Sequence, residues 1–318
     1  MCDEQNLDWY GERATVVAGN ADFTTIEYDC DGDGQLLDYA LFPGIDLIFT
    51  SFHCTDTFRE PIPNRDVIEI RHCRTGRIEF EMRTDKVFHM KEGELCINAL
   101  VNIPAAYSFP FDYSEGLSIV IDRAAVDEET RSIFSFHNID VGGIGSELDI
   151  DKRWFLCQTP AHLLHIFDEL YAAKKREGRD YFRIKILELF YHIKRLSLED
   201  QYDATYYSRA QIEIIKRVRR RLIENHEDKL SIDALLRNEP MSKVTFQTIF
   251  KQIYGDTPYA HVKKYKMNLA AIYLQQTDWS ITEIAGSLGY ANSSKFAAAF
   301  QSVFGMLPKD YRRAKKST

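Results

Sequence analysis

Alternation of apolar and polar residues dominates roughly the first 145 residues of the chain. Ile68, Ile70 and His72 share one face of a predicted strand, a turn follows at residues 74–76, and the alternation resumes in a second predicted strand that reaches Met82. Further short β-like runs, separated by turns that contain glycine, occur at residues 47–52, 94–98 and 117–121. Many short strands without intervening helical patterns predict a β-barrel or β-sandwich.

The pattern changes to helical spacing near Thr159. Apolar residues recur every three or four positions from Ala161 to Tyr171. A second apolar seam then consists of Phe182, Ile186, Leu189, Ile193 and Leu196. Such a seam packs against another element, which belongs either to the same chain or to a second copy of it. A polar linker at 198–208 is predicted to follow these two helices.

The last third of the chain contains an internal repeat. The segment Phe250–Gly255 recurs as Phe300–Gly305 at an offset of 50, and Pro258 and Pro308 obey the same offset. Upstream, Ser231-Ile232 and Ser280-Ile281 match at an offset of 49, so the two turns differ by one residue. Each copy predicts a short helix, a turn, a longer helix that ends before glycine, and then a proline.

Capping residues support a helix-turn-helix in each copy. In the second copy Ser280 is the predicted N-cap of the short helix, with Glu283 completing a capping box. Gly289 can adopt the left-handed conformation that ends this helix, and Asn292 or Ser293 then caps the longer one. In the first copy Ser242 takes that place.

The longer helix of each copy is predicted to be a recognition helix. Its core side consists of Phe246, Ile249, Phe250 and Ile253 in the first copy, and of Phe296, Phe300, Val303 and Phe304 in the second. Its outward side carries Lys243, Val244, Gln247, Thr248 and Lys251 in the first copy, and Ser293, Ser294, Lys295, Ala297, Ala298 and Gln301 in the second. Small or hydrogen-bonding side chains suit a helix lying in the major groove of DNA. A long connecting helix is predicted over 259–275, with Val262, Tyr265, Leu269 and Ile272 facing inward.

Charge separates the two regions. The chain has 318 residues and a net charge of −8, and its length favours two domains. Residues 208–318 hold 19 Lys and Arg against 10 Asp and Glu, whereas residues 1–207 hold 21 against 38. A basic segment on an acidic body suggests that one part meets a polyanion. The six scattered cysteines and the lack of a signal peptide or membrane-spanning run indicate a cytoplasmic protein with reduced thiols.

Residues 212–313 resemble the AraC/XylS family of bacterial transcription regulators. The strongest stretches are Ile284–Tyr290, Ser294–Phe300 and Phe304–Arg312. The resemblance implies a seven-helix domain that binds double-stranded DNA, with both recognition helices in successive major grooves. By matching positions, the base-facing residues are Val244, Gln247, Thr248, Ser293, Ser294, Lys295, Ala297 and Ala298. Phosphate contacts are expected from Lys243, Lys251 and the cluster Lys263, Lys264 and Lys266.

Three positions depart from the family pattern. Many members carry Arg where this chain has Thr248 and Ala298, and Lys or Arg where it has Gln301. The turn at 237–240 also lacks the usual glycine. Sequence reading would then depend more on Gln247, Ser294 and Lys295, or on DNA shape.

For the rest of the chain the resemblance implies a cupin-like β-barrel that binds a small effector, followed by helices that dimerise. We therefore expect an α+β chain with an effector domain at 1–157, a helical dimerisation region at 158–207 and the DNA-binding domain at 208–318. The candidate effector residues are His72, Phe80, Tyr107 and Phe109, because aromatic side chains with a few polar groups line typical ligand pockets.

Two alternative functions are kept open. A cupin-type metal-dependent enzyme would need clustered ligands, whereas His53, His72 and His89 lie far apart in sequence. The other alternative is a dimeric DNA-binding protein that senses no ligand. The favoured hypothesis is an effector-gated regulator, not an enzyme, without metal or cofactor and without a membrane partner. Its expected partners are double-stranded DNA, a small molecule, a second copy of the chain and RNA polymerase.

Overall fold

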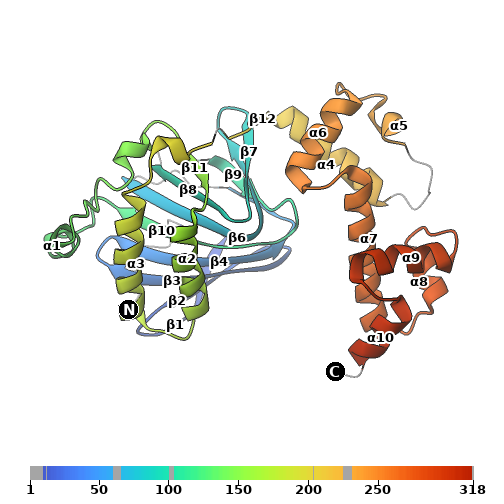
Figure 1. Cartoon of the computed structure of the whole chain (residues 1–318), viewed down its shortest axis with the longest axis horizontal. Helices are drawn as coiled ribbons and strands as arrows, with labels where there is room; N and C mark the ends of the chain where they lie inside the picture. Colours follow the sequence, from blue (N-terminus) through green and yellow to red (C-terminus); the bar gives the residue numbers. More distant parts are fainter. Residues whose placement is uncertain are drawn as a thin grey trace. The chain divides into compact units, whose positions relative to one another are not determined.

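The computed structural model describes residues 10–11, 13–59, 66–99, 104–202, 204–224 and 231–316. The chain divides into two compact units, residues 1–207 (unit 1) and residues 208–318 (unit 2), which are described separately (Figure 1). No helix among the described residues is both long and apolar enough to cross a lipid bilayer.

Unit 1 is built on one large sheet. Its strands are β1 (Ala14–Gly19), β2 (Thr24–Tyr28), β3 (Gly32–Phe42), β4 (Ile45–Cys54), β5 (Thr57–Arg59), β6 (Val67–Met82), β7 (Lys86–Lys91), β8 (Glu94–Ala99), β9 (Pro104–Ser108), β10 (Ser114–Asp122), β11 (Phe155–Gln158) and β12 (Tyr207–Ser208). The main path runs β1-β2-β3-β4-β10-β6-β7-β12. Strands β8 and β9 also pair with β6, β11 pairs with β8, and β5 pairs with β9.

The predicted turn at residues 74–76 is wrong, because β6 runs through it as one strand from Val67 to Met82. The first half of β6 pairs with β10 and β8, and the second half pairs with β7 and β9. Gly76 lies at the change of partners with φ +82, and a Cβ there would lie 2.4 Å from the carbonyl oxygen of Tyr113. The Thr-Gly signal therefore marks an irregularity within a long strand, not the end of one.

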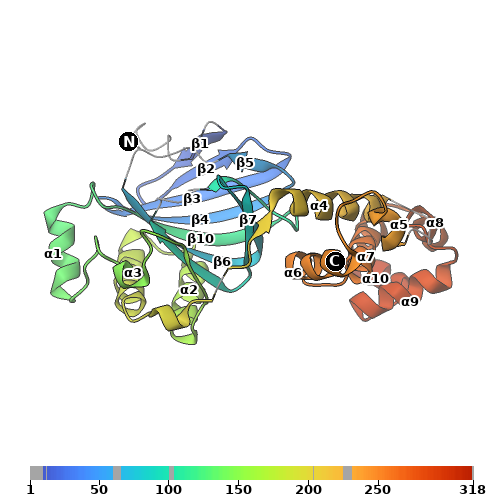
Figure 2. The same ribbon diagram turned by 90° about the horizontal axis from the view of Figure 1, so that it is seen from above.

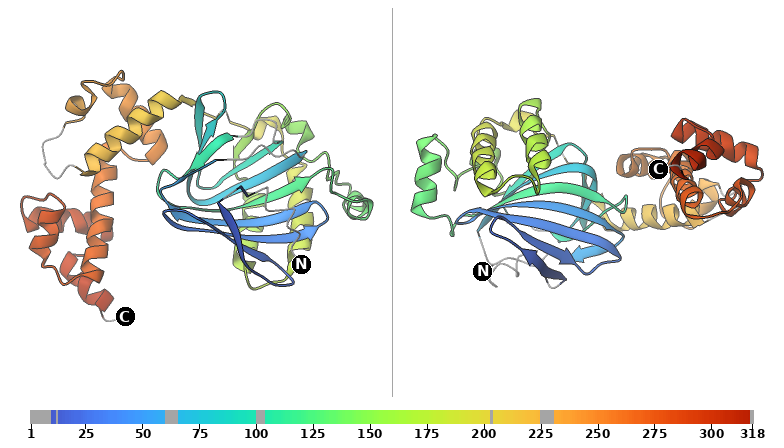
Figure 3. Two further views of the ribbon diagram at one scale, coloured as in Figure 1. Left: turned by 180° about the vertical axis from the view of Figure 1, so that it is seen from behind. Right: turned by 90° about the horizontal axis from the view of Figure 1, so that it is seen from below.

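The sheet is strongly curled, but its described strands do not close into a barrel (Figure 3). Strands β2 and β5 lie near opposite ends of the strand order, yet the rings of Tyr28 and Phe58 are 5.4 Å apart. The enclosed side, here called the interior face, carries buried residues such as Leu36, Ile48 and Phe52. The opposite outer face carries Leu37, Leu47, Phe49 and others. The expected β-barrel or sandwich is thus a curled, antiparallel half-barrel.

Two helices cover the outer face, α2 (Ala161–Ala173) and α3 (Arg179–Ile193) (Figure 2). The predicted seam of Phe182, Ile186, Leu189 and Ile193 is completely buried there, in the same cluster as the sheet residues. Of the two interpretations of the seam, packing within the chain is the correct one. Unit 1 also contains α1 (Glu128–Phe136) and two short 3-10 turns at Ser146–Leu148 and Leu198–Asp200.

The described part of unit 2 contains seven helices. They are α4 (Arg209–Glu224), α5 (Ile232–Leu236), α6 (Lys243–Tyr254), α7 (Pro258–Gln276), α8 (Ile281–Ser287), α9 (Ser293–Phe304) and α10 (Pro308–Lys316). The repeat is visible in the backbone, because Gly255 and Gly305 end α6 and α9 in the left-handed conformation with φ +78 and +74. In both cases a proline begins the next helix, as is favourable at a first helical position.

The predicted inward face of the connecting helix α7 is wrong in part. Tyr265 and Ile272, expected to face inward, are 38% and 46% exposed. The buried residues are instead Pro258, Met267, Ala270, Ala271 and Leu274. Alanines form part of this buried face, and their small side chains let neighbouring helices approach α7 closely. The prediction relied on large apolar residues and therefore missed this face.

The burial of α3 leads to a prediction about stability. Ile186→Ala should lower the free energy of unfolding of unit 1 by about 2–5 kcal/mol, because it leaves a void between α3 and the sheet. Ile133→Ala on α1 is the control, since Ile133 is 38% exposed and should change stability by less than about 0.5 kcal/mol. Urea denaturation of the full chain measures both, and equal effects would contradict the packing described.

Candidate nucleic-acid interface and effector site

The first helix-turn-helix consists of α5, a turn and α6. The Ser242 hydroxyl accepts a hydrogen bond from the Thr245 amide (3.1 Å) and so caps α6 as predicted. The turn is fastened to α4 by Arg217, whose guanidinium donates to both carboxylate oxygens of Glu239 at 2.9 and 2.7 Å. These hydrogen bonds hold the pKa of Glu239 below its ordinary value. The turn at 237–240, which has no glycine, is thus held by an ion pair with α4.

The second helix-turn-helix consists of α8, a turn and α9. Ser280 and Glu283 form the predicted capping box, with hydrogen bonds of 3.1 and 2.6 Å. Gly289 adopts φ +82, and the Asn292 side chain accepts from the Lys295 amide at 2.9 Å. Of the two predicted caps of α9, Asn292 is therefore the one used. Arg312 of α10 supports this unit by donating to the carbonyl of Trp279 at 2.6 Å.

The outward face of α6 is open to solvent. Lys243, Val244, Gln247, Thr248 and Lys251 are all exposed, while the four predicted core residues are buried. Val244 is the most exposed apolar side chain of this helix, with an exposed fraction of 74%. The Lys243 ammonium group forms an ion pair with Asp233 of α5 at 2.6 Å, and this contact raises the pKa of Lys243.

The outward face of α9 consists of short side chains. Ser294, Lys295, Ala298 and Gln301 are exposed, whereas Ser293 and Ala297 are half-buried. Phe296 and Phe300 are buried beneath them. Such a helix offers hydroxyl, ammonium and methyl groups near its backbone, and these can reach base edges when the helix lies deep in a groove.

Three of the four candidate effector residues lie together on the interior face. Phe80 and Tyr107 are cross-strand partners on β6 and β9. The rings of Tyr107 and Phe109 are 5.9 Å apart, and Phe109 stacks on Phe52 at 4.8 Å. These rings pack against one another and form an apolar lining on part of the interior face.

His72 does not join this group, because it lies on the outer face beneath α2. Its ring stacks on Phe167 at 4.3 Å, and its Nδ1 is 2.9 Å from the hydroxyl of Tyr171. Burial and the neighbouring Arg74 lower the pKa of His72 to about 4, so the ring is neutral. The predicted face shared with Ile68 and Ile70 is confirmed, but that face meets the helices and not the interior.

The interior face also carries polar residues that the sequence pattern did not single out. Asp38 on β3, Ser118 on β10 and Asn98 on β8 are 8%, 4% and 1% exposed. Among the described residues, the side-chain atoms Asp38 Oδ1, Ser118 Oγ and both polar atoms of Asn98 have no conventional hydrogen-bond partner, although Asn98 lies beside the thiol of Cys96. Because buried polar groups normally have partners, each such group needs an explanation.

Asp38 has an unusual environment for a carboxylate. Its Oδ2 accepts a hydrogen bond from the hydroxyl of Tyr10 at 2.8 Å. Burial raises the pKa of Asp38 from 3.8 to about 6, and the bond from Tyr10 opposes this shift. Desolvation disfavours the ionised form, and no neighbouring cation restores it.

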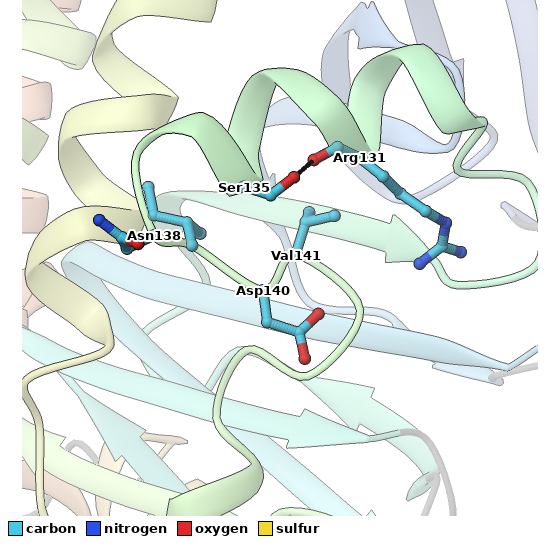
Figure 4. A pocket seen from close by; sticks show the side chains of 6 residues that line it. Arg131, Ser135, Asn138, Asp140 and Val141 are labelled. Atoms are coloured by element: carbon cyan, nitrogen blue, oxygen red, sulfur yellow. Dashed lines mark hydrogen bonds between the residues drawn. The ribbon is translucent and has the colours of Figure 1, made fainter.

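A hollow lies beside α1, away from the polar residues just described (Figure 4). It is lined by Arg131, Ser135, Asn138, Ile139, Asp140 and Val141. The Arg131 guanidinium donates to the carbonyl of Arg123, and Asp140 accepts from the amide of Gly142. Its charged groups therefore already stabilise their own loop. Within the described residues no three His, Cys, Asp or Glu side chains lie close enough to hold a metal ion.

Two capped helix-turn-helix units joined by one long helix define a class of DNA-binding domain, and the comparisons with known proteins agree. Residues 235–314 match the family described as "Helix-turn-helix domain". The regulatory protein SoxS of Escherichia coli is 32% identical over 91 residues, which are 28% of this chain and 85% of SoxS. The chain belongs to the AraC family of helix-turn-helix transcriptional regulators.

Two other relatives show how far the similarity extends. The HTH-type transcriptional regulator AlkR of Acinetobacter baylyi is 31% identical over 87 residues, 27% of this chain and 28% of AlkR. An uncharacterized HTH-type transcriptional regulator of Haemophilus influenzae is 24% identical over 251 residues, 72% of this chain and 81% of that protein. These relatives are named as regulators and not as enzymes. Across the first four relatives, the match covers at most 31% of the relative's own length.

The raised pKa of Asp38 predicts how stability depends on pH. A carboxyl whose pKa is higher in the folded state stabilises the fold when protonated, and this contribution is lost as the pH rises through about 6. Asp38→Asn removes the titration. The wild type loses this contribution to its free energy of unfolding between pH 4.5 and pH 7.5, and the variant does not. The difference in free energy of unfolding, variant minus wild type, should therefore rise by about 1–3 kcal/mol over that range.

Asp33→Asn is the control for this experiment, because Asp33 lies on the same strand and is exposed. Urea denaturation at the two pH values measures both variants. A pH-independent difference between Asp38→Asn and wild type would show that Asp38 is not desolvated in the folded protein.

Proposed function

We propose that this protein is a transcriptional regulator that binds double-stranded DNA through α6 and α9. The observation that carries the proposal is the duplicated helix-turn-helix, in which both longer helices carry a face of mostly exposed side chains opposite their buried core residues. On α6 this face is Lys243, Val244, Gln247, Thr248 and Lys251, and on α9 it is Ser293, Ser294, Lys295 and Ala298. The excess of basic residues in unit 2 supports attraction to a polyanion.

The chemistry of each face suggests a role for particular residues. Gln247 can bond the edge of adenine, and the methyl groups of Val244 and Ala298 can contact thymine. Lys295 can donate to guanine, while Lys243 and Lys251 at the margins suit phosphates. Binding of both helices to one face of the duplex requires major-groove segments about 34 Å apart. We propose in addition that the protein acts in the cytoplasm and that RNA polymerase is a further partner, as suits a regulator that binds DNA.

We further propose that unit 1 binds a small effector on its interior face and thereby changes DNA affinity. Phe80, Tyr107 and Phe109 supply the apolar lining, and His72, which lies beneath α2, is left out of this set. Gating requires that the effector favour one of two arrangements of the dimer, since equal affinity for both shifts nothing. No catalytic step is part of this function.

We also propose a homodimer formed through the helices at 160–197. The predicted seam is used within the chain, so the interface needs the outward side of α3. Ile184 and Tyr191 are 66% and 45% exposed and lie seven residues apart, on one side of that helix. Apolar side chains aligned in this way suit a helix–helix contact between two copies.

Base reading by the recognition helices predicts separable effects on DNA binding. Gln247→Ala and the double variant Ser294→Ala/Lys295→Ala should each lose about 5- to 150-fold of the preference for specific over scrambled DNA. Lys251→Ala should weaken binding to both duplexes alike and reduce the salt slope by about one. Titration against DNA from upstream of its own gene at two salt concentrations measures these effects.

Lys152→Ala is the matched control, because this lysine side chain is 79% exposed in unit 1 and lies outside both recognition helices. It should bind like wild type. If all four variants lose affinity equally, or the wild type prefers no duplex with or without a bound effector, the DNA-reading proposal is wrong.

The dimer proposal predicts that one charge on α3 separates the copies. Ile184→Asp should shift the chain from dimer to monomer in sedimentation velocity, because the carboxylate would be desolvated at the contact. Phe136→Asp is the comparison on α1, where Phe136 is 84% exposed. A dimer that persists with Ile184→Asp but dissociates with Phe136→Asp would move the interface to α1.

A further inference from the structure

The three polar side chains without partners lie on one face and at regular spacing. In the strand order β3-β4-β10-β6-β8 they occupy β3, β10 and β8, so one strand separates each from the next. Asp38 pairs with Ile48 and Ile48 pairs with Ser118, which places all three side chains on the same side of the sheet. Adjacent strands lie about 4.8 Å apart, so each step is about 10 Å along the curled sheet.

Asn98 belongs to the same face by the same argument. It pairs with Glu69, and Glu69 pairs with Val120, two residues beyond Ser118 on β10. Side chains two residues apart on a strand share a face. Because the sheet curls around this face, the three groups lie on its concave side (Figure 3).

The charge on this face favours one class of ligand. The Asp38 carboxylate has a tyrosine hydroxyl beside it but no cation. The guanidinium of Arg71 is on the same face, but it donates to Glu69 at 2.7 and 2.9 Å. A ligand carboxylate would have to compete with Glu69 for Arg71, whereas a ligand cation would meet an unneutralised carboxylate at Asp38.

We propose that the effector of this regulator is a small molecule with an ammonium group that pairs with Asp38 and with separate hydroxyl or amide groups, one that bonds Ser118 and another that bonds Asn98. The inference rests on the proposed function, because it assigns the chemistry of the effector site in unit 1. The ammonium group replaces the missing counter-charge of Asp38. The neutral polar groups satisfy the hydroxyl of Ser118 and the carboxamide of Asn98, which have no hydrogen-bond partner among the described residues.

Binding should depend on pH through Asp38. Asp38 is hydrogen-bonded to Tyr10 of the N-terminal segment, and the other ionisable groups that act on Tyr10 are Tyr28 on β2 and Asp46 on β4. Burial keeps the pKa of Asp38 near 6. An ammonium ligand should therefore bind about tenfold more weakly at pH 5 than at pH 7.5, since most of the carboxyl is protonated at pH 5.

Three probes of equal length test the class: 6-amino-1-hexanol, 1,6-hexanediol and 6-hydroxyhexanoate. They differ in one end group, which is an ammonium, a hydroxyl or a carboxylate. Calorimetry with the full chain should give at least tenfold tighter binding of aminohexanol than of the other two. Asp38→Asn should abolish this difference, and Asp33→Asn, an equal charge change at an exposed site of β3, should preserve it.

A second variant guards against misfolding of Asp38→Asn. Ser118→Ala keeps the carboxylate of Asp38. It should weaken the binding of aminohexanol and the binding of hexanediol by a similar factor, several-fold each. The proposal is overturned if the three probes bind equally, if aminohexanol does not bind at millimolar concentration, or if its advantage survives in Asp38→Asn.

DNA titration in the presence of each probe separates this inference from the proposed gating. Aminohexanol that binds through Asp38 without changing DNA affinity supports the ligand class and overturns gating. A DNA affinity that responds to the diol or the carboxylate but not to the amine supports gating and overturns the ligand class.

Discussion

The structure of unit 2 depends on the close packing of its neighbours around α7. Met267, Ala270 and Leu274 are buried along one side of this helix, and α4, α6, α8, α9 and α10 all contact it. With 19 residues it is about 28 Å long, close to the roughly 34 Å of one DNA turn. One continuous helix therefore holds the two helix-turn-helix units at a fixed separation, which two flexibly linked units would lack. Reading two successive grooves then requires no ordering of a linker at the moment of binding.

Unit 1 divides its work between the two faces of one sheet. The outer face buries apolar side chains against α2 and α3, and this cluster is the larger of the two described in the unit. The interior face combines aromatic rings with buried polar groups that lack partners. Such groups cost stability, which the outer face can supply. Because the packing of the outer face stabilises the sheet, the interior face can carry polar groups that lower stability.

The sequence predicts local features of this chain well and long-range ones less well. Caps such as Ser280, Asn292 and Gly289 act within a few residues, so their spacing was enough to place the helices. The inward side of α7 was misjudged, because alanines bury well without looking like a core. His72 was assigned to the correct face, but which face the helices cover depends on contacts 99 residues away, such as its bond to Tyr171. Asp38 and Asn98 were missed because an isolated polar residue in a strand does not reveal whether it has a partner.

The central claim is that α6 and α9 bind neighbouring grooves as one rigid pair. Hydroxyl-radical footprinting of the full chain on DNA from upstream of its own gene tests it most directly. The account predicts that each subunit protects two segments about 10 base pairs apart on one face of the duplex. Ser294→Ala/Lys295→Ala should weaken only one of the two. A single protected segment per subunit, or two segments whose spacing varies between sites, would contradict the rigid pair.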